Sequence, residues 1–257
     1  MTTIRTIRPP QRYLRGKRKR YPHNISGGRA FSPASIAGLQ LWLKADAITG
    51  LNDGDPVATW SDSSGNGRDA TQSTPANRPT YKVNIVNGRP VVRFAAANSQ
   101  SLNLPNFLTG FSAGEIFIVI KITNDPTTGV GAGGLWEFGS DAAASHYCFT
   151  DGIIYDAFGT TARKTTVNPT PTLAAWRLYN VSSAAGAWTS RLDTAQLFTT
   201  GTNTVGWTTT PKFATSGAGA FFTDGDIAEL ILYSSVLSTT DRSSLSSHLS
   251  AKYALSF

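Results

Sequence analysis

Short runs of apolar residues, separated by glycine, asparagine, aspartate and proline, recur along the chain after residue 31. Runs of this length that are rich in β-branched and aromatic side chains and bounded by turn residues are typical of β-strands. The predicted strands are LQLWLKA (39–45), VATWSD (57–62), PVVRFAA (90–96), EIFIVIKI (115–122), WRLYNVSS (176–183), AWTSRLD (187–193) and DIAELILY (226–233). This alternation of strands and turns predicts an all-β fold, an antiparallel two-sheet β-sandwich of the jelly-roll kind.

Two segments have patterns of their own. Nearly every position of EIFIVIKI is apolar, which predicts a central strand covered on both faces. Near the end of the chain, Ser238 is followed three residues later by Asp241, a typical start of a helix. Apolar side chains then recur at four-residue steps, at Leu237, Leu245, Leu249 and Tyr253. We therefore expect one amphipathic C-terminal helix that closes the domain.

Composition adds that packing alone must hold this fold. The chain has 257 residues, of which 40% are apolar and 15% charged, enough for one sizeable core. The single cysteine, Cys148, excludes an internal disulfide framework. No stretch approaches the roughly 18 consecutive apolar residues of a membrane span, and the first 30 residues lack the apolar stretch of a secretory signal. We expect no membrane insertion.

The net positive charge of the protein comes entirely from its first 30 residues. The formal net charge is +7, with 23 basic and 16 acidic residues in the whole chain. Nine of the basic residues precede position 30, where no acidic residue occurs, so the remainder is slightly acidic. These nine are Arg5, Arg8, Arg12, Arg15, Lys17, Arg18, Lys19, Arg20 and Arg29. The pattern predicts two parts: an extended basic anchoring arm (1–30) and a β-sandwich domain (31–257).

Several stretches of the sandwich domain occur in an order known from one family. They are IAGLQLWLKADA (36–47), VATWSDSSGNGRDATQ (57–72), RPTY (78–81), NGRPVVRF (87–94), DGDIAELILYSSVLSTTDR (224–242) and LSAKYAL (249–255). Together they resemble the laminin-G-like, concanavalin-A-like jelly-roll domains of bacterial and phage surface proteins. The resemblance implies a sandwich whose relatives mostly bind carbohydrate, with a minority that cleave glycans. Lys44 and the segment AAANS (95–99) depart from the acidic residue and the Asp-Gly pair common in that family.

The sequence does not favour an enzyme. Glycosidases need two carboxylates about 5–10 Å apart, and the Glu-x-Asp-x-x-Glu strand of the laminarinase-type members is absent. Asp226 and Glu229, three residues apart in a predicted strand, should point to opposite faces and make a poor pair. His146 and Cys148 would share a strand face, yet a lone cysteine is more often a small core residue than half of a catalytic dyad.

Aromatic residues are the better candidates for binding, because the apolar face of a sugar ring stacks on tryptophan or tyrosine. The carbohydrate-binding candidates outside the clearest core patterns are Trp136, Tyr147, Tyr155, Trp188 and Trp207. For these five the sequence is equally compatible with burial in the core and with exposure at the surface.

For cofactors, the sequence predicts none except a possible calcium ion. Asp62 and Asn66 in DSSGNGRD (62–69) are spaced like the start of a calcium loop, although a tight turn in which they bond their own backbone is the favoured interpretation.

Three roles compete for the basic arm: non-specific binding to nucleic-acid phosphates, a nuclear address in GKRKR (16–20), and docking to a partner protein. The apolar anchors Tyr13, Leu14 and Tyr21 favour protein docking. We therefore expect a virion structural protein on the surface of a phage, part of a multi-copy assembly, whose arm docks on a capsid, neck or tail protein. Its lectin-like domain would adhere to a surface glycan. The alternatives are a glycan-degrading enzyme of the same fold, or a capsid shell protein whose arm contacts the genome.

Overall fold

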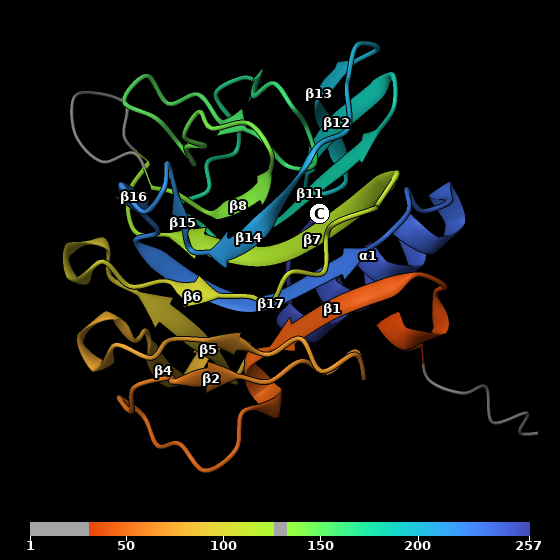
Figure 1. Cartoon of the computed structure of the whole chain (residues 1–257). Coiled ribbons are helices and arrows are strands. Elements are labelled where there is room, and N and C mark those ends of the chain that lie inside the picture. The colour runs from red at the N-terminus through yellow and green to blue at the C-terminus, as the bar shows by residue number, and fades with distance from the viewer. Residues whose placement is uncertain (1–30, 126–132) are drawn as a thin grey trace, which may run out of the picture. The chain divides into compact units, whose positions relative to one another are not determined.

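Two antiparallel β-sheets face each other in the computed structural model, which describes residues 31–125 and 133–257 (Figure 1). The larger sheet contains, in spatial order, β13 (Ala195–Thr200), β12 (Ala187–Leu192), β11 (Arg177–Ala184), β7 (Ala113–Ile122), β17 (Gly225–Tyr233), β5 (Arg89–Phe94) and β4 (Thr80–Val86), with β1 (Leu39–Lys44) also paired to β17. The second sheet has the order β2 (Thr59–Trp60), β3 (Ala70–Thr71), β6 (Leu102–Asn103), β14 (Trp207–Phe213) and β8 (Trp136–Gly139). The predicted all-β sandwich is confirmed.

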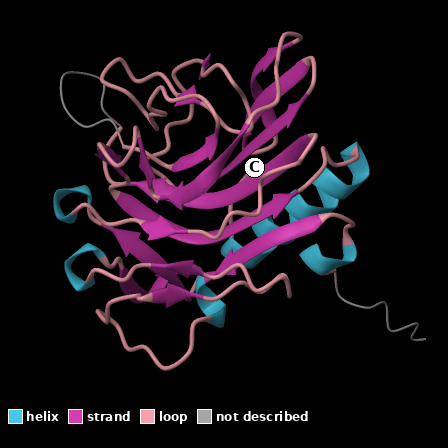
Figure 2. Cartoon of the chain, viewed as in Figure 1, coloured by secondary structure: helices cyan, strands magenta, loops and turns pink. Residues whose placement is uncertain are grey.

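Shorter elements connect and flank the two sheets. Two small hairpin sheets pair β9 (Tyr155–Asp156) with β10 (Lys164–Thr165) and β15 (Thr215–Ser216) with β16 (Phe221–Phe222). Four 3₁₀ turns lie at Pro33–Ser35, Ala45–Ala47, Pro75–Asn77 and Ala96–Asn98. The single α-helix of the described residues is α1 (Thr239–Tyr253) (Figure 2). The predicted arm, with all its candidate anchors, lies outside the described residues.

The central strand β7 is covered on both faces, as its continuous apolar sequence predicts. Ile116, Ile118 and Ile120 point into the core between the two sheets. Phe117 and Val119 point to the opposite face, where they pack in a second cluster under α1. Because side chains alternate along a strand, a strand with two buried faces has almost no polar position.

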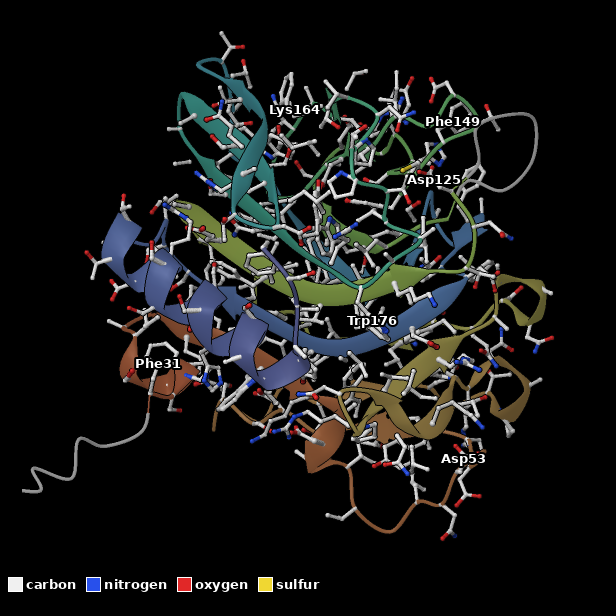
Figure 3. The ribbon with its side chains drawn as sticks, turned by 180° about the vertical axis from the view of Figure 1, so that it is seen from behind. Phe31, Asp53, Asp125, Phe149, Lys164 and Trp176 are labelled. Atoms are coloured by element: carbon white, nitrogen blue, oxygen red, sulfur yellow. The ribbon has the colours of Figure 1, made fainter. Side chains whose placement is uncertain are left out.

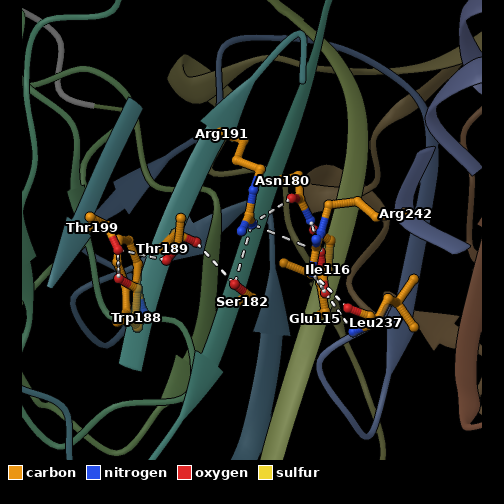
Figure 4. Close-up of polar contacts among 10 residues, drawn as sticks. All are labelled: Glu115, Ile116, Asn180, Ser182, Trp188, Thr189, Arg191, Thr199, Leu237 and Arg242. Atoms are coloured by element: carbon orange, nitrogen blue, oxygen red, sulfur yellow. Dashed lines mark hydrogen bonds and ion pairs between the residues drawn. The ribbon is translucent and has the colours of Figure 1, made fainter. Parts of the chain in front are cut away.

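The helix α1 is fixed to the outer face of the larger sheet by packing and by one buried ion-pair network. Ser238 caps its start by accepting a hydrogen bond from the backbone N–H of Asp241, as predicted. Glu115 of β7 is fully buried and accepts two hydrogen bonds from Arg242 in the first turn of the helix, at 2.6 and 3.0 Å (Figure 4). Asn180 of β11 donates a third, at 2.9 Å. The position of the helix on the sheet is therefore set by this ion pair as well as by apolar packing.

A β-bulge corrects one expectation about β17. The pairing of β17 with β7 shifts between Ile227 and Glu229, so that Ala228 is an extra residue on its strand. The bulge turns Glu229 onto the same outer face as Asp226, against the expected opposite orientation. The two carboxylates nevertheless bind different partners. Asp226 accepts two hydrogen bonds from Arg93, and Glu229 accepts hydrogen bonds from residues of β1 and α1.

Within the described ranges, no helix combines the length and the apolar character needed to cross a membrane.

Candidate functional site

A polar pocket opens at the end of the second sheet, where β8, the loop that follows it and the β15–β16 hairpin meet. Its volume is about 210 Å³, and its polar lining comes from Glu137, Ser140, Asp141, Ser145, Thr208 and Ser216. Hydroxyl and carboxylate groups of this kind can exchange hydrogen bonds with the hydroxyls of a sugar. The pocket is therefore suited to a small neutral polar ligand.

Backbone packing holds the wall of this pocket in place. Gly139 ends β8 at a point where an added Cβ would lie 1.7 Å from the carbonyl oxygen of Ala157, so only glycine fits there. Asp141 accepts hydrogen bonds from the backbone N–H groups of Ala143 and Arg163. These contacts fix the Asp141 carboxylate at the rim without a counter-ion of its own among the described residues.

The pocket continues into a row of polar side chains that crosses the second sheet. Cross-strand pairing places Thr59 beside Thr71, Thr71 beside Asn103, Asn103 beside Lys212, and Lys212 beside Glu137. All five side chains face away from the core, because their chain neighbours fill it. Lys212 Nζ lies 3.7 Å from a carboxylate oxygen of Glu137. A chain-like ligand bound in the pocket would therefore extend over a hydrophilic surface.

An aromatic cluster of His146, Phe149, Tyr155 and Phe221 adjoins the pocket. The His146 ring lies 4.6 Å from both Phe149 and Phe221, and Phe149 lies 5.6 Å from Tyr155. Three of the four are partly exposed and His146 is buried. Phe221 pairs with Ser216 of the pocket wall, which joins the two features. In Figure 3 the labelled Phe149 lies among the loops at the opposite side of the molecule from Phe31.

Charged groups frame this aromatic cluster. The guanidinium of Arg163 lies 4.8 Å from the centre of the Tyr155 ring, and the Tyr155 hydroxyl donates to Asp151 at 2.8 Å. Burial, together with the positive charge of Arg163, lowers the pKa of His146 to about 4. His146 is therefore a neutral ring at pH 7 and contributes an apolar face to the cluster.

Three of the five aromatic candidates lie in the core. Trp136, Tyr147 and Trp188 are at most 3% exposed, so their rings are not available to stack on a sugar, and the hypothesis is corrected for them. Trp136 donates its indole N–H to the buried Asp156, and Trp188 donates to the carbonyl of Phe158. Each polar tip thus meets an internal partner, as buried tryptophans require.

Trp207 is partly exposed but serves packing. Its indole N–H donates to the carbonyl of Phe111 at 2.8 Å, and its ring lies against Phe158 at 5.2 Å. A Cβ added at Gly114 or Gly159 would come within 2.8 Å of this ring, so the ring fits tightly between β7 and the turn at Gly159. Of the five sequence-predicted aromatics, Trp136 lines the pocket but is buried, and the partly exposed Tyr155 belongs to the neighbouring aromatic cluster.

The loop with the calcium-like spacing forms a closed turn. Asp62 accepts hydrogen bonds from the backbone N–H groups of Trp42, Ser64 and Arg68 and from the Ser64 hydroxyl. Asn66 donates its amide N–H to the carbonyls at positions 39 and 40. The oxygens that a cation would need are engaged by donors, so the residues do not fit a calcium site. Across the described residues no cluster of three acidic, histidine or cysteine side chains is arranged for a metal.

The alternative dyad of His146 and Cys148 does not form. Cys148 is fully buried in the main core, where burial raises the pKa of its thiol, while His146 belongs to the aromatic cluster. A neutral thiol without a basic partner is a poor nucleophile.

The pocket itself has almost no local signal in the sequence. Glu137, Asp141, Thr208 and Ser216 come from segments up to 79 positions apart, and only the folded pairing of β8 with β14 brings them together. Phe149 and Phe221 follow no strand periodicity that would single them out.

The fold is an antiparallel β-sandwich, and several solved structures share it. The ligand-binding domain of botulinum neurotoxin serotype D, solved in complex with N-acetylneuraminic acid, matches with a TM-score of 0.61 at 12% identity, over 84% of this chain and 52% of that one. A mosaic serotype C/D binding domain matches with a TM-score of 0.59 at 13% identity, over 82% and 51% of the two chains. Trypanosoma rangeli sialidase matches with a TM-score of 0.53 at 14% identity, over 84% of this chain and 33% of that one.

These similarities establish the fold and nothing finer. The chain spans about half of the toxin domains and a third of the sialidase. No family model matches the sequence, and no curated protein matches it either. The resemblance to laminin-G-like and concanavalin-A-like domains is thus supported at the level of a lectin-like β-sandwich.

Proposed function

We propose that this protein is an adhesive carbohydrate-binding module of a virion, whose sandwich domain binds a surface glycan while its basic arm docks on a capsid, neck or tail protein. The observation that carries the binding function is a pocket of hydroxyl and carboxylate groups next to the aromatic cluster that holds the partly exposed ring of Tyr155. The two are joined at Ser145, which lines the pocket and precedes His146, the residue paired with Tyr155. A sugar needs both: an aromatic face for its C–H groups, and hydrogen-bonding partners for its hydroxyls.

A glycan array probed with the full chain tests the binding function. We expect a subset of glycans to be retained, and Tyr155→Ala to weaken their binding by up to about tenfold, because one stacking contact of about 0.5–1.5 kcal/mol is lost. Tyr155→Phe keeps the ring and is the matched control, which should bind within about twofold of the unaltered protein. Unchanged binding by Tyr155→Ala would place the ligand elsewhere.

The arm is tested separately, by comparing two variants of the full chain. One variant replaces the apolar anchors Tyr13, Leu14 and Tyr21 by serine, and the other replaces the basic cluster at 15–20 by glutamine. Docking on a structural protein predicts that the apolar variant is lost from purified particles. A genome-binding arm predicts instead that the basic variant is lost and that binding to DNA falls steeply with salt.

Glycan hydrolysis is the second candidate function, because two carboxylates, Glu137 and Asp141, line one pocket. Glu137 is held by the backbone N–H of Gly219 and by Lys212, and Asp141 by two backbone N–H groups. Both are therefore arranged as fixed hydrogen-bond acceptors, which favours binding. Release of reducing ends from an array-positive glycan, abolished by Glu137→Gln, would establish hydrolysis instead.

A further inference from the structure

A second recess lies on the other side of the molecule, where the start of the described chain meets β1, β5 and the C-terminal half of α1. Its volume is about 470 Å³, and it is lined by Phe31, Trp42, Lys44, Arg89, His248 and Lys252 among others. It shares no residue with the polar pocket near β8. We call it the α1 groove, and Figure 3 shows its residue Phe31 beside α1.

Aromatic rings form one part of the α1 groove. The Phe31 ring lies 5.2 Å from the ring of His248, and both are partly exposed. The Trp42 indole is anchored by a hydrogen bond of 2.5 Å from its Nε1 to Glu229. An anchored indole keeps a fixed ring plane, which is the property that a stacking platform needs.

Positive charge dominates the exposed part of the same groove. Arg89 has a side chain that is 40% exposed, and Lys44 lies over Trp42 with its Nζ 4.3 Å from the ring centre. Two acids, Asp46 and Glu229, lie nearby, but Lys252 binds both of them at 3.1 and 2.7 Å. Asp46 also binds Arg89 at 3.0 Å.

Lys44 is the cation in excess. Among the described residues it forms no ion pair, whereas the other two cations of the groove share the two acids. The acid Glu229 is also only 1% exposed, so a ligand would meet the cations first. The groove therefore has a net positive edge beside an aromatic wall.

From this combination we propose that the α1 groove binds an acidic monosaccharide unit, a pyranose ring with one carboxylate. The carboxylate lies between Lys44 and Arg89, and the ring lies against the aromatic wall formed by Trp42 and Phe31. The volume suits a small ligand, since pockets for such molecules measure about 300–1,000 Å³. A neutral sugar would leave Lys44 without a counter-ion, and a simple anion would make no contact with the aromatic wall.

Nuclear magnetic resonance titration of the full chain tests the proposal with four probes: sodium glucuronate, N-acetylneuraminate, glucose and sodium acetate. We expect the two acidic sugars to shift the Trp42 indole N–H signal in a saturable way. Glucose should have no effect, and acetate should bind at least about tenfold more weakly. Equal binding of glucose or of acetate would overturn the proposal, as would the absence of any shift.

Substitutions at Lys44 locate the site. Lys44→Gln should weaken glucuronate binding about tenfold, the effect of one charge-assisted hydrogen bond, and Lys44→Arg should restore it. Lys121→Gln removes an exposed lysine outside the groove and is the matched control, with no expected effect. If the two glutamine variants bind equally well, the carboxylate is not held at Lys44.

His248 provides a readout that a purely structural role of Lys44 would not move. Burial lowers the pKa of His248 below its ordinary value. A carboxylate bound in the groove favours the imidazolium, so the pKa of His248 should rise when glucuronate is present. In Lys44→Gln the same shift should need about tenfold more glucuronate, and in Tyr155→Ala it should be unchanged, which separates this proposal from the glycan site near β8. A His248 pKa that glucuronate leaves unchanged would contradict binding in the groove.

Discussion

Two buried carboxylates, Asp156 and Glu229, support the two sides of this molecule in nearly the same way, with one difference. Each is at most 1% exposed, and each accepts a hydrogen bond from a tryptophan indole and another from a tyrosine hydroxyl. The third donor differs: it is the uncharged backbone N–H of Phe158 for Asp156, and the ammonium of Lys252 for Glu229. The pair shows what a counter-charge adds when the other donors are matched.

On the pocket side, the charge of Asp156 is balanced only by dipoles. Its Oδ1 accepts from Trp136 at 3.1 Å and from Phe158 at 2.7 Å, and its Oδ2 accepts from Tyr179 at 2.9 Å. Burial raises the pKa of Asp156, because no cation offsets the loss of solvation. Trp136 and Ala157 line the polar pocket, so this network positions the proposed glycan site from beneath.

On the groove side, the ammonium group of Lys252 balances the charge of the buried Glu229 carboxylate. Glu229 accepts from Trp42 at 2.5 Å and from Tyr253 and Lys252 at 2.7 Å. Trp42 and Lys252 line the α1 groove, so Glu229 orients both the aromatic wall and one cation of that site. The carboxylate that positions the groove residues is therefore stabilised by an ion pair, whereas the carboxylate beneath the pocket is stabilised by hydrogen bonds from uncharged donors.

The largest expected effect comes from removing the counter-charge. Lys252→Met should lower the free energy of unfolding by about 3–5 kcal/mol, because Glu229 would remain buried without a cation. Urea denaturation measures the loss. Lys121→Met, at an exposed position, is the control and should stay within about 0.5 kcal/mol of the unaltered protein. Similar values for the two variants would mean that the ion pair contributes nothing.

A matched pair of tyrosine variants tests the neutral donors. Tyr179→Phe should cost about 1–3 kcal/mol, since it removes one of three donors from a carboxylate without a counter-ion. Tyr253→Phe makes the same change at Glu229 and should cost less, because Lys252 remains. Denaturation of both variants at pH 7 makes the comparison. If Tyr253→Phe lowers the free energy of unfolding more than Tyr179→Phe does, Lys252 is not the main stabilising donor to Glu229.

A third effect concerns His146, which lies on the pocket side and whose Nδ1 has no hydrogen-bond partner among the described residues. Its folded-state pKa is about 4, below the ordinary value of 6.5. Between these values the unfolded chain takes up a proton and the folded protein does not, so stability falls as the pH falls through this window. His146→Phe should remove this fall, which amounts to about 3 kcal/mol at pH 4. Thermal unfolding at pH 7 and pH 4 checks it, and an unchanged slope would contradict it.

The strands and the helix could be predicted where their signal is local. The apolar run of β7 and the cap at Ser238 depend on neighbouring residues only, and both predictions are confirmed. The orientation of Glu229 could not be predicted, because the bulge at Ala228 is created by pairing with β7.

The candidate site was harder to predict than the fold. Trp136 and Tyr155 have similar surroundings in the sequence, yet one is buried and the other partly exposed. Which aromatic ring is covered depends on loops that come from distant segments. The α1 groove likewise joins residues from both ends of the described chain, although Lys44 already departs from the resembled family in the sequence.

The smallest expected effect is that of an amide in place of Asp156, and it separates the two carboxylates most sharply. In Asp156→Asn, the amide oxygen can keep the Trp136 and Phe158 N–H groups, which share Oδ1, while the Tyr179 hydroxyl turns to accept from the amide N–H. We expect a change within about 1 kcal/mol at pH 7. Glu229→Gln should lower the free energy of unfolding by more than Asp156→Asn does. The amide N–H₂ of the glutamine would face the Lys252 ammonium, which has no lone pair and cannot accept a hydrogen bond.

The pH dependence of Asp156→Asn then gives the sign of the effect. The folded-state pKa of Asp156 is raised above the unfolded value of 3.8, so the folded protein takes up this proton first as the pH falls. The unaltered protein should therefore gain stability relative to Asp156→Asn as the pH falls through the folded-state pKa towards 3.8, and no further below it. Denaturation of both proteins at several pH values measures this difference. If the unaltered protein instead loses stability relative to the variant in that window, Asp156 is a stabilised carboxylate like those of salt bridges, and the contrast with Glu229 disappears.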